Sequence, residues 1–238
     1  MLIVQASVVR VVQLVCQSSL QFGTGSVDVP LEWTTATSGK MGCIDYFNCG
    51  IDSITGWSPP YIPMDQVVSR MADLKEAIKK PGSPFRACEQ FVPIFEKYAQ
   101  VFGVPAILMA SFALQESTCN PSTTGGAGEA GLMQLTPDKC YDAPNGNCYD
   151  PDYNISAGFK YFAERLAANN GDFLLTCGNY NGWFKGMTYA NGPCCRCQNN
   201  LDYLQQLANG FLQNVNAYDP NHRLGKYFNL DKCNHGST

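Results

Sequence analysis

The sequence predicts a mostly α-helical fold, and three observations support this prediction. Apolar residues recur at helical spacing in several stretches, whereas no stretch shows the sustained alternation that is typical of a strand. Proline and glycine stand at the boundaries of these stretches, where helices begin and end. The 238 residues suit one full-sized domain with extensions, so a substantial buried core can form.

The N-terminal third is expected to be mainly irregular. Residues 17–63 are rich in Ser, Thr, Gly and Pro, which predicts an irregular segment pinned by disulfides. Apolar residues then follow helical spacing over residues 64–80, and Pro81-Gly82 ends that pattern. We therefore expect one helix here, followed by a short linker.

A series of helices is expected after this linker. Residues 86–100 carry an apolar stripe at helical spacing, which Gly103 ends. Pro105 suits the first turn of a helix, and residues 106–115 are apolar on nearly every side, as expected for a helix buried in the middle of a domain. The remaining expected helices are at about 154–168 and 199–215.

The twelve cysteines indicate an oxidising compartment, where they can pair as disulfides. Cytosolic proteins seldom carry so many unpaired cysteines. We therefore expect a secreted, extracellular protein. Cys43 with Cys49 and Cys140 with Cys148 are the simplest local disulfides, although spacing alone does not fix connectivity. The Cys194–Cys197 cluster also suggests zinc, but no His lies at ligand spacing, so disulfides are favoured over a metal.

The N-terminus and the net charge bear on location and partners. Residues 1–16 are rich in Val and Leu but are interrupted by polar residues, so they form either a poor signal peptide or a misassigned start. They are too short for a convincing transmembrane helix. The net charge of −4 gives no electrostatic reason to expect nucleic acid or an anionic membrane as a partner. We expect a monomer without a cofactor that binds a polymer in a groove.

Glu116 is the candidate catalytic residue. It lies four residues after Phe112 and eight after Leu108, so helical geometry places it on the same face as these apolar side chains. Partial desolvation there would raise its pKa from about 4.3 toward roughly 6 and keep the carboxyl protonated as a general acid. The alternative is a glutamate that only marks the exposed end of a helix.

Four sequence blocks follow in order from this residue. They are Glu116-Ser117-Thr118-Cys119-Asn120-Pro121, Gly131-Leu132-Met133-Gln134-Leu135-Thr136-Pro137, residues 150–161 and Asn179-Tyr180-Asn181-Gly182-Trp183. In this order and spacing they closely resemble the lytic transglycosylase family, which shares the goose-type lysozyme fold. The resemblance covers about residues 86–185. It implies a mostly α, lysozyme-like helical domain of the SLT type.

The resemblance also implies a division of the chain. We expect an N-terminal extension over residues 1–84, a lysozyme-like catalytic domain over residues 85–218, and a tail over residues 219–238 tied by Cys233. The N-terminal extension has no counterpart in the family pattern.

The family pattern implies roles for particular residues. Glu116 is the implied acid–base residue, and the implied substrate contacts are Ser117, Met133, Gln134, Tyr180, Asn181 and Trp183. A glycine-rich loop before Gln134 lets the backbone approach a sugar chain, and the amide of Gln134 can orient N-acetyl or hydroxyl groups. Packing in the core is favoured for Met133, and for Trp183 it is as good an interpretation as stacking on a sugar.

Two positions have other interpretations. Glu129 stands where the family usually has alanine, so it is the alternative second carboxylate. Asn154-Ile155-Ser156 matches a glycosylation sequon, but the family pattern places this asparagine at the start of a helix beside the active groove, which disfavours a glycan.

The implied reaction is cleavage of β-1,4 glycosidic bonds in peptidoglycan or a related N-acetylglucosamine-containing polymer. Ordinary glycosidases use two carboxylates, whereas the motif supplies one, so the expected products are 1,6-anhydro sugars. A lysozyme-like or chitinase-like hydrolase is the nearest alternative. An inactive glycan-binding protein and a disulfide-rich structural protein remain as alternatives of other classes, and the intact blocks weigh against both.

Overall fold

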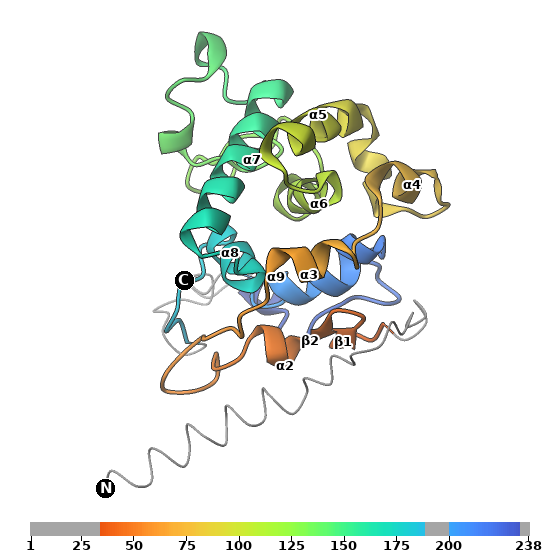
Figure 1. Cartoon of the computed structure of the whole chain (residues 1–238), viewed down its shortest axis with the longest axis vertical. Helices are drawn as coiled ribbons and strands as arrows, with labels where there is room; N and C mark the ends of the chain where they lie inside the picture. The colour runs from red at the N-terminus through yellow and green to blue at the C-terminus, as the bar shows by residue number, and fades with distance from the viewer. Residues whose placement is uncertain (1–33, 189–199, 234–238) are drawn as a thin grey trace, which may run out of the picture. The chain divides into compact units, whose positions relative to one another are not determined.

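The computed structural model describes residues 34–188 and 200–233, and helices predominate in them (Figure 1). In these ranges the only sheet is the antiparallel pair β1 (Ser38–Gly39) and β2 (Gly42–Cys43). The mostly α prediction is therefore confirmed. The expectations for residues 1–16, for the Cys194–Cys197 cluster and for the tie through Cys233 lie outside the described residues and side chains.

The chain divides into two compact units. One unit contains residues 65–171 and 210–216, and we call it the nested unit because the other unit supplies the chain on both sides. The other, which we call the outer unit, contains the described residues 34–64, 172–188, 200–209 and 217–233. The division into 1–84, 85–218 and 219–238 stays a prediction.

The nested unit is built around one buried helix. Its elements are α3 (Met64–Val68) from Asp65 onward, α4 (Leu74–Lys79), η2 (Pro84–Phe91), α5 (Val92–Phe102), α6 (Ala106–Ser117), η3 (Pro137–Lys139), η4 (Pro144–Gly146), α7 (Pro151–Ala168) and η7 (Phe211–Gln213). Every α6 residue from Ala106 to Leu114 is buried, and the helix contacts α4, α5, α7, η2 and η7 (Figure 1). On one side Phe112 packs against Phe162 of α7, with ring centroids 5.5 Å apart. Because neighbouring elements cover α6, its sequence is apolar on nearly every side.

The ends of these helices follow local chemistry. Gly103 ends α5 in the left-handed conformation with φ of 66°, as its position predicts. Pro105 is the N-cap of α6, one residue before the first turn. Pro151 opens α7, and the Asp150 carboxylate accepts a hydrogen bond from the Tyr153 N–H at 3.0 Å.

Two expected helices are interrupted. The helix expected over residues 64–80 is divided into α3 (Met64–Val68) and α4. Residues 69–73 separate the two helices, and Asp73, which has an extended backbone, caps α4 by accepting from the Glu76 N–H at 3.0 Å. Apolar spacing continues across this break, so periodicity alone suggests one helix.

The helix expected over residues 199–215 is also divided. It consists of α9 (Tyr203–Gln205), the π-helical turn η6 (Gln206–Gly210) and η7. Gly210 has φ of −95° and ψ of −94°, which no regular helix adopts. This glycine therefore separates the turn from η7.

Two tryptophans pack together in the core of the outer unit. Its remaining helices are α2 (Ile44–Phe47), α8 (Phe173–Tyr180) and α10 (Asn229–Cys233). Trp57 and Trp183 meet edge to face with ring centroids 5.0 Å apart, and both rings are buried. Gly178 of α8 makes room for them, because a Cβ there would lie 2.2 Å from the Trp57 ring.

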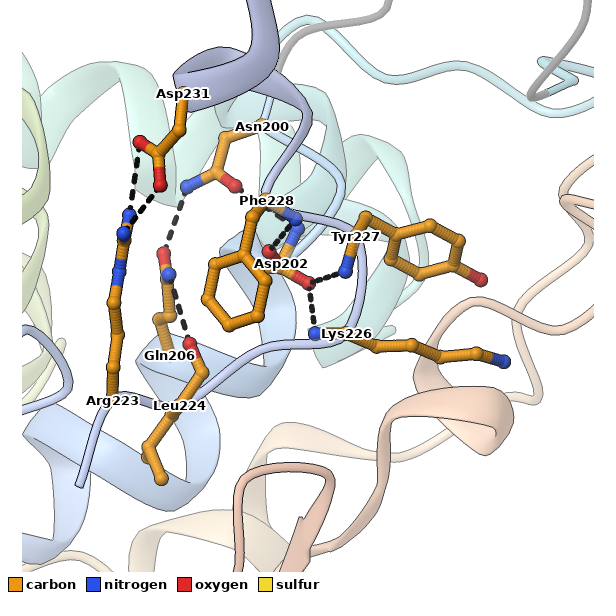
Figure 2. A network of polar contacts seen from close by, with 9 residues as sticks. All are labelled: Asn200, Asp202, Gln206, Arg223, Leu224, Lys226, Tyr227, Phe228 and Asp231. Carbon is orange, nitrogen blue, oxygen red and sulfur yellow. Dashed lines mark hydrogen bonds and ion pairs between the residues drawn. The ribbon is translucent and has the colours of Figure 1, made fainter.

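Asp202 anchors the last described segment of the outer unit (Figure 2). Its side chain is 1% exposed, and it does not cap α9, which it precedes. Instead the carboxylate accepts hydrogen bonds from the backbone N–H groups of Lys226, Tyr227 and Phe228, at 2.7, 2.9 and 2.7 Å. Gly225 is required beside it, since a Cβ at this position would lie 2.7 Å from Cγ of Asp202.

The structure tests both local disulfides. The Cys140–Cys148 disulfide is confirmed, and a second one joins Cys88 of η2 to Cys119 after α6. The pairing of Cys43 with Cys49 is wrong, because Cys43 is a free thiol and Cys49 is disulfide-bonded. The four-residue helix α2 lies between the two cysteines.

The two nested-unit disulfides are expected to differ in their contribution to stability. They close loops with sequence separations of 31 and 8 residues. Loop-closure entropy then predicts that the Cys88→Ser/Cys119→Ser variant loses about 4 kcal/mol of unfolding free energy, and the Cys140→Ser/Cys148→Ser variant about 2.5 kcal/mol. Urea denaturation of both variants measures the difference. Equal shifts in the two midpoints would contradict this order.

Candidate active site

Glu116 lies in the last turn of α6, as the sequence predicts, and its side chain is half-buried. The helix ends directly after it, because Thr118 and Cys119 both adopt positive φ, 55° and 58°. The Cys119 N–H donates to the carbonyl of Ala113 at 3.0 Å, which closes the end of the helix. Since Cys119 is also disulfide-bonded, the turn that carries Glu116 is held in place covalently.

Ser117 joins the end of α6 to the Gly-Leu-Met-Gln block. Its side chain is buried, and its hydroxyl contacts the backbone carbonyls of Ala113 at 3.0 Å and Leu132 at 2.9 Å. Leu132 is fifteen residues further along the chain, so this bond sets the position of the block relative to Glu116. The contacts of Ser117 in the structure are thus with the protein itself.

The glycine-rich loop folds back on itself beside this block. Isolated antiparallel bridges pair Thr124 with Ala130 and Ala130 with Leu135. A Cβ on Gly125 would lie 2.3 Å from Oε2 of Glu129 and 2.7 Å from Oε1 of Gln134, so both side chains crowd this α-carbon. Only glycine fits at Gly125 without displacing them.

Gln134 is held by its amide nitrogen. Its backbone is left-handed, with φ of 45°, and Nε2 donates to the carbonyls of Thr123 at 3.1 Å and Gly131 at 2.9 Å. The side chain is half-buried, and in the described part of the chain no hydrogen bond to Oε1 is found. This oxygen is therefore the atom with capacity to accept from a sugar N–H or O–H.

The side chain of Glu129 forms a hydrogen bond within its own loop. Its Oε2 accepts a hydrogen bond from the Ala127 N–H at 3.0 Å, and the side chain is half-buried. The carboxylate thus stabilises the glycine-rich loop, and its Oε2 lies close to the same α-carbon as Oε1 of Gln134.

Asn154 hydrogen-bonds to the backbone of the loop that carries Gln134, a structural role that was not predicted from the sequence. Its side chain is fully buried in α7; Oδ1 accepts from the Met133 N–H at 2.8 Å, and Nδ2 donates to the carbonyls of Ala130 at 2.9 Å and Cys148 at 2.8 Å. Glycosylation at this position is excluded because Nδ2 has no access to solvent. The sequence does contain an indication of this role. Asn154 shares an apolar helix face with Gly158 and Phe162, and a polar side chain on such a face needs buried hydrogen-bond partners.

Met133 and Trp183 are core residues. Met133 is 1% exposed and packs on α7, where a Cβ on Gly158 would lie 2.9 Å from its Cγ. Trp183 is also 1% exposed and packs against Trp57, which leaves no ring face open to a sugar. Core packing is therefore the better interpretation for both side chains, and their contact with substrate stays a prediction.

Tyr180 and Asn181 stand at the end of α8 in the outer unit. Both are half-buried, and Nδ2 of Asn181 donates to the carbonyl of Asn200 at 3.4 Å. Their expected contact with substrate stays a prediction.

Residues 34–188 and 200–233 contain neither a cluster of metal ligands nor a membrane-spanning helix. No group of three or more His, Cys, Asp or Glu side chains is arranged there to hold a metal ion. None of the helices in these ranges has the length and apolar character needed to cross a membrane.

The family follows from one comparison. A family model described as the transglycosylase SLT domain matches residues 93–216, which is just over half of the chain. The chain belongs to this family. All eight residues singled out from sequence lie within the matched range, and so do α6, the glycine-rich loop and Asn154. The resemblance stated from the four sequence blocks is thereby confirmed.

Individual relatives match shorter segments of this SLT-domain chain. A transglycosylase of Enterobacteria phage PRD1 is 42% identical over 59 residues, which are 25% of this chain and 22% of the phage protein. Membrane-bound lytic murein transglycosylase F of Haemophilus influenzae is 38% identical over 72 residues, 30% of this chain and 14% of that protein. The match thus spans less than a quarter of either curated relative.

Two solved structures match parts of this chain. The 70 kDa soluble lytic transglycosylase of Escherichia coli matches with a TM-score of 0.35 and 24% identity over 37% of this chain and 16% of that one. A complex of a 70 kDa soluble lytic transglycosylase with bulgecin A matches with a TM-score of 0.36 and 25% identity, over 39% and 16%.

Proposed function

We propose that this chain cleaves β-1,4 glycosidic bonds of peptidoglycan, with Glu116 as its single acid–base residue and 1,6-anhydro sugars as its products. The observation that carries the proposal is the Ser117–Leu132 hydrogen bond, which joins the turn bearing Glu116 to the block bearing Gln134. Membership of the SLT family and the names of its relatives, among them a murein transglycosylase, support peptidoglycan as the substrate.

The proposed reaction has two proton transfers through one carboxyl group. Protonated Glu116 donates to the glycosidic oxygen, and the bond from this oxygen to C1 breaks. The C6 hydroxyl of the same sugar then bonds to C1 and gives its proton to the Glu116 carboxylate, which restores the starting state. Water is not consumed, so no second carboxylate is needed to activate it.

Gln134 and Glu129 have separate parts in this proposal. Gln134 accepts from the sugar through Oε1, because Nε2 is used by backbone carbonyls. Glu129 shapes the loop through its bond to Ala127, which supports a structural role over that of a base. We also propose that the protein acts as a monomer outside the cell, where its disulfides persist.

Product masses test the proposal. Purified peptidoglycan is digested with the wild type and with Glu129→Gln, which keeps an acceptor oxygen for Ala127 but removes the second carboxylate. We expect both proteins to release anhydro products, which are lighter by one water than hydrolysis products, at rates within about threefold of each other.

Two other results would contradict the proposal. Hydrated products from the wild type that become scarce with Glu129→Gln would make the protein a hydrolase with Glu129 as its second carboxylate. Peptidoglycan that is bound but never cut would make it a glycan-binding protein. Chitin, incubated in parallel and analysed by product mass in the same way, tests whether the polymer has been assigned correctly.

A further inference from the structure

Between the glycine-rich loop and α7 the nested unit carries a loop closed by the Cys140–Cys148 disulfide. We call residues 140–149 the disulfide loop, and this segment lies next to the N-terminal end of α7 (Figure 1). Two of its side chains are exposed aromatics: Tyr141 is 83% exposed and Tyr149 is 37% exposed. Neither residue has a part in the chemistry proposed for Glu116.

The disulfide loop is fixed at both ends. At one end the Tyr153 hydroxyl donates to the carbonyl of Lys139 at 2.7 Å and contacts the Asp142 carboxylate. Burial, and then Asp142, raises the pKa of Tyr153 to about 12, so this hydroxyl stays a donor at neutral pH. At the other end Asn154 donates to the carbonyl of Cys148. The aromatic side chains therefore stand on a rigid support.

Tyr149 connects the disulfide loop to the candidate active site. Its hydroxyl and that of Thr124 lie 2.8 Å apart and share a hydrogen bond. Thr124 directly precedes Gly125, the position crowded by Glu129 and Gln134. Asn154 completes the connection, because it bonds Cys148 of the disulfide loop and Met133 next to Gln134. The Tyr149 ring is thus placed against the loop that presents Gln134.

The chemistry of the disulfide loop suits an uncharged sugar. Asp142 is its only charged residue, and Asn145, Gly146 and Asn147 form a polar turn. An exposed aromatic face with neutral amides beside it matches a pyranose ring, which has an apolar face and hydroxyls at its edge. A held ring also loses little side-chain entropy when a ligand binds.

We propose that Tyr149, assisted by Tyr141, forms a sugar-stacking subsite for the glycan strand at a distance from the bond that Glu116 cleaves. The subsite binds an amino sugar other than the two that flank the cleaved bond, so it contributes to affinity for long strands and leaves the chemical step unchanged. This inference rests on the proposed function, since that function supplies the polymer.

The test compares long and short substrates. KM and kcat are measured on peptidoglycan strands and on short muropeptide fragments for the wild type, Tyr149→Ala, Tyr149→Phe and Tyr141→Ala. Tyr61→Ala is the matched control, because Tyr61 is a 59% exposed tyrosine of the outer unit. On long strands we expect Tyr149→Ala to raise KM about fivefold and Tyr141→Ala about twofold, with kcat unchanged. On short fragments, both variants should match the wild type.

Tyr149→Phe separates stacking from a structural role. It keeps the ring but removes the bond to Thr124, so a stacking residue keeps KM within about twofold. If Tyr149→Phe is as impaired as Tyr149→Ala, or if strands and fragments are affected alike, the subsite does not exist. If Tyr149→Ala does not fold, the exposed Tyr141→Ala carries the test alone, and an unchanged KM overturns the proposal.

Failure of the proposed function is recognised separately. A wild type that cuts no peptidoglycan refutes the cleavage reaction, and co-sedimentation with insoluble peptidoglycan then tests the subsite. Weaker co-sedimentation of Tyr149→Ala than of Tyr61→Ala supports the subsite without cleavage. Equal co-sedimentation, or no binding by the wild type, refutes it.

Discussion

Replacing Glu116 with glutamine is expected to lower turnover of peptidoglycan by at least about 100-fold, because general acid–base catalysis commonly contributes 10²–10⁴-fold. The amide has nearly the shape of the carboxyl group but cannot pass a proton to the glycosidic oxygen. Binding should survive, so the variant should still co-sediment with insoluble peptidoglycan. Initial rates of product release, measured by mass spectrometry, give the size of the loss.

Glu164→Gln is the matched control for this prediction. Glu164 is an exposed glutamate on α7 of the same unit, so the same chemical change is made outside the candidate site. It should keep the wild-type rate, and both variants should unfold at the wild-type temperature. If Glu116→Gln retained near-full turnover while folded, the acid–base assignment would be wrong.

Replacing Asp202 with alanine is expected to lower the unfolding free energy by about 5 kcal/mol. Three backbone N–H groups donate to this buried carboxylate, and each hydrogen bond to a charged group contributes roughly 1.5–3 kcal/mol. The variant leaves the N–H groups of Lys226, Tyr227 and Phe228 without their acceptor. Because domains are stable by only about 5–15 kcal/mol in total, the loss should be evident in urea denaturation.

Asp231→Ala is the control for Asp202→Ala. The Asp231 carboxylate pairs with Arg223 in the same region (Figure 2), but both side chains are well exposed. Exposed ion pairs contribute about 0–1 kcal/mol, so this variant should lie close to the wild type. Equal losses for the two aspartates would mean that the buried hydrogen bonds do not anchor the segment.

The sequence predicts best the elements whose surroundings agree with their local pattern. α6 is apolar on nearly all sides because it is buried among five other elements, so its burial could be inferred from composition alone. Gly103 ends α5 by its own backbone preference. Glu116 could be placed at the end of α6 for the same reason, since its helical register with Phe112 needs no knowledge of distant residues.

The features that sequence reasoning missed depend on residues far apart in the chain or on a single capping side chain. Trp183 could not be assigned to the core before Trp57, over a hundred residues earlier, was known to cover it. The role of Asn154 depends on Met133, Ala130 and Cys148, which periodicity does not bring together. The break at Asp73 is a local cap placed within an apolar pattern that continues on both sides.

The nesting of one unit inside the other has a consequence for the order of events during synthesis. Once residue 171 has been synthesised, the nested unit is complete except for residues 210–216. The outer unit consists of three separated stretches of the chain, and the last of them begins at residue 217. Contacts between distant stretches form slowly, because loop closure must precede them. We therefore expect the half of the protein that carries Glu116 to become compact on the ribosome or soon after emerging, while residues 34–64 wait for partners synthesised much later.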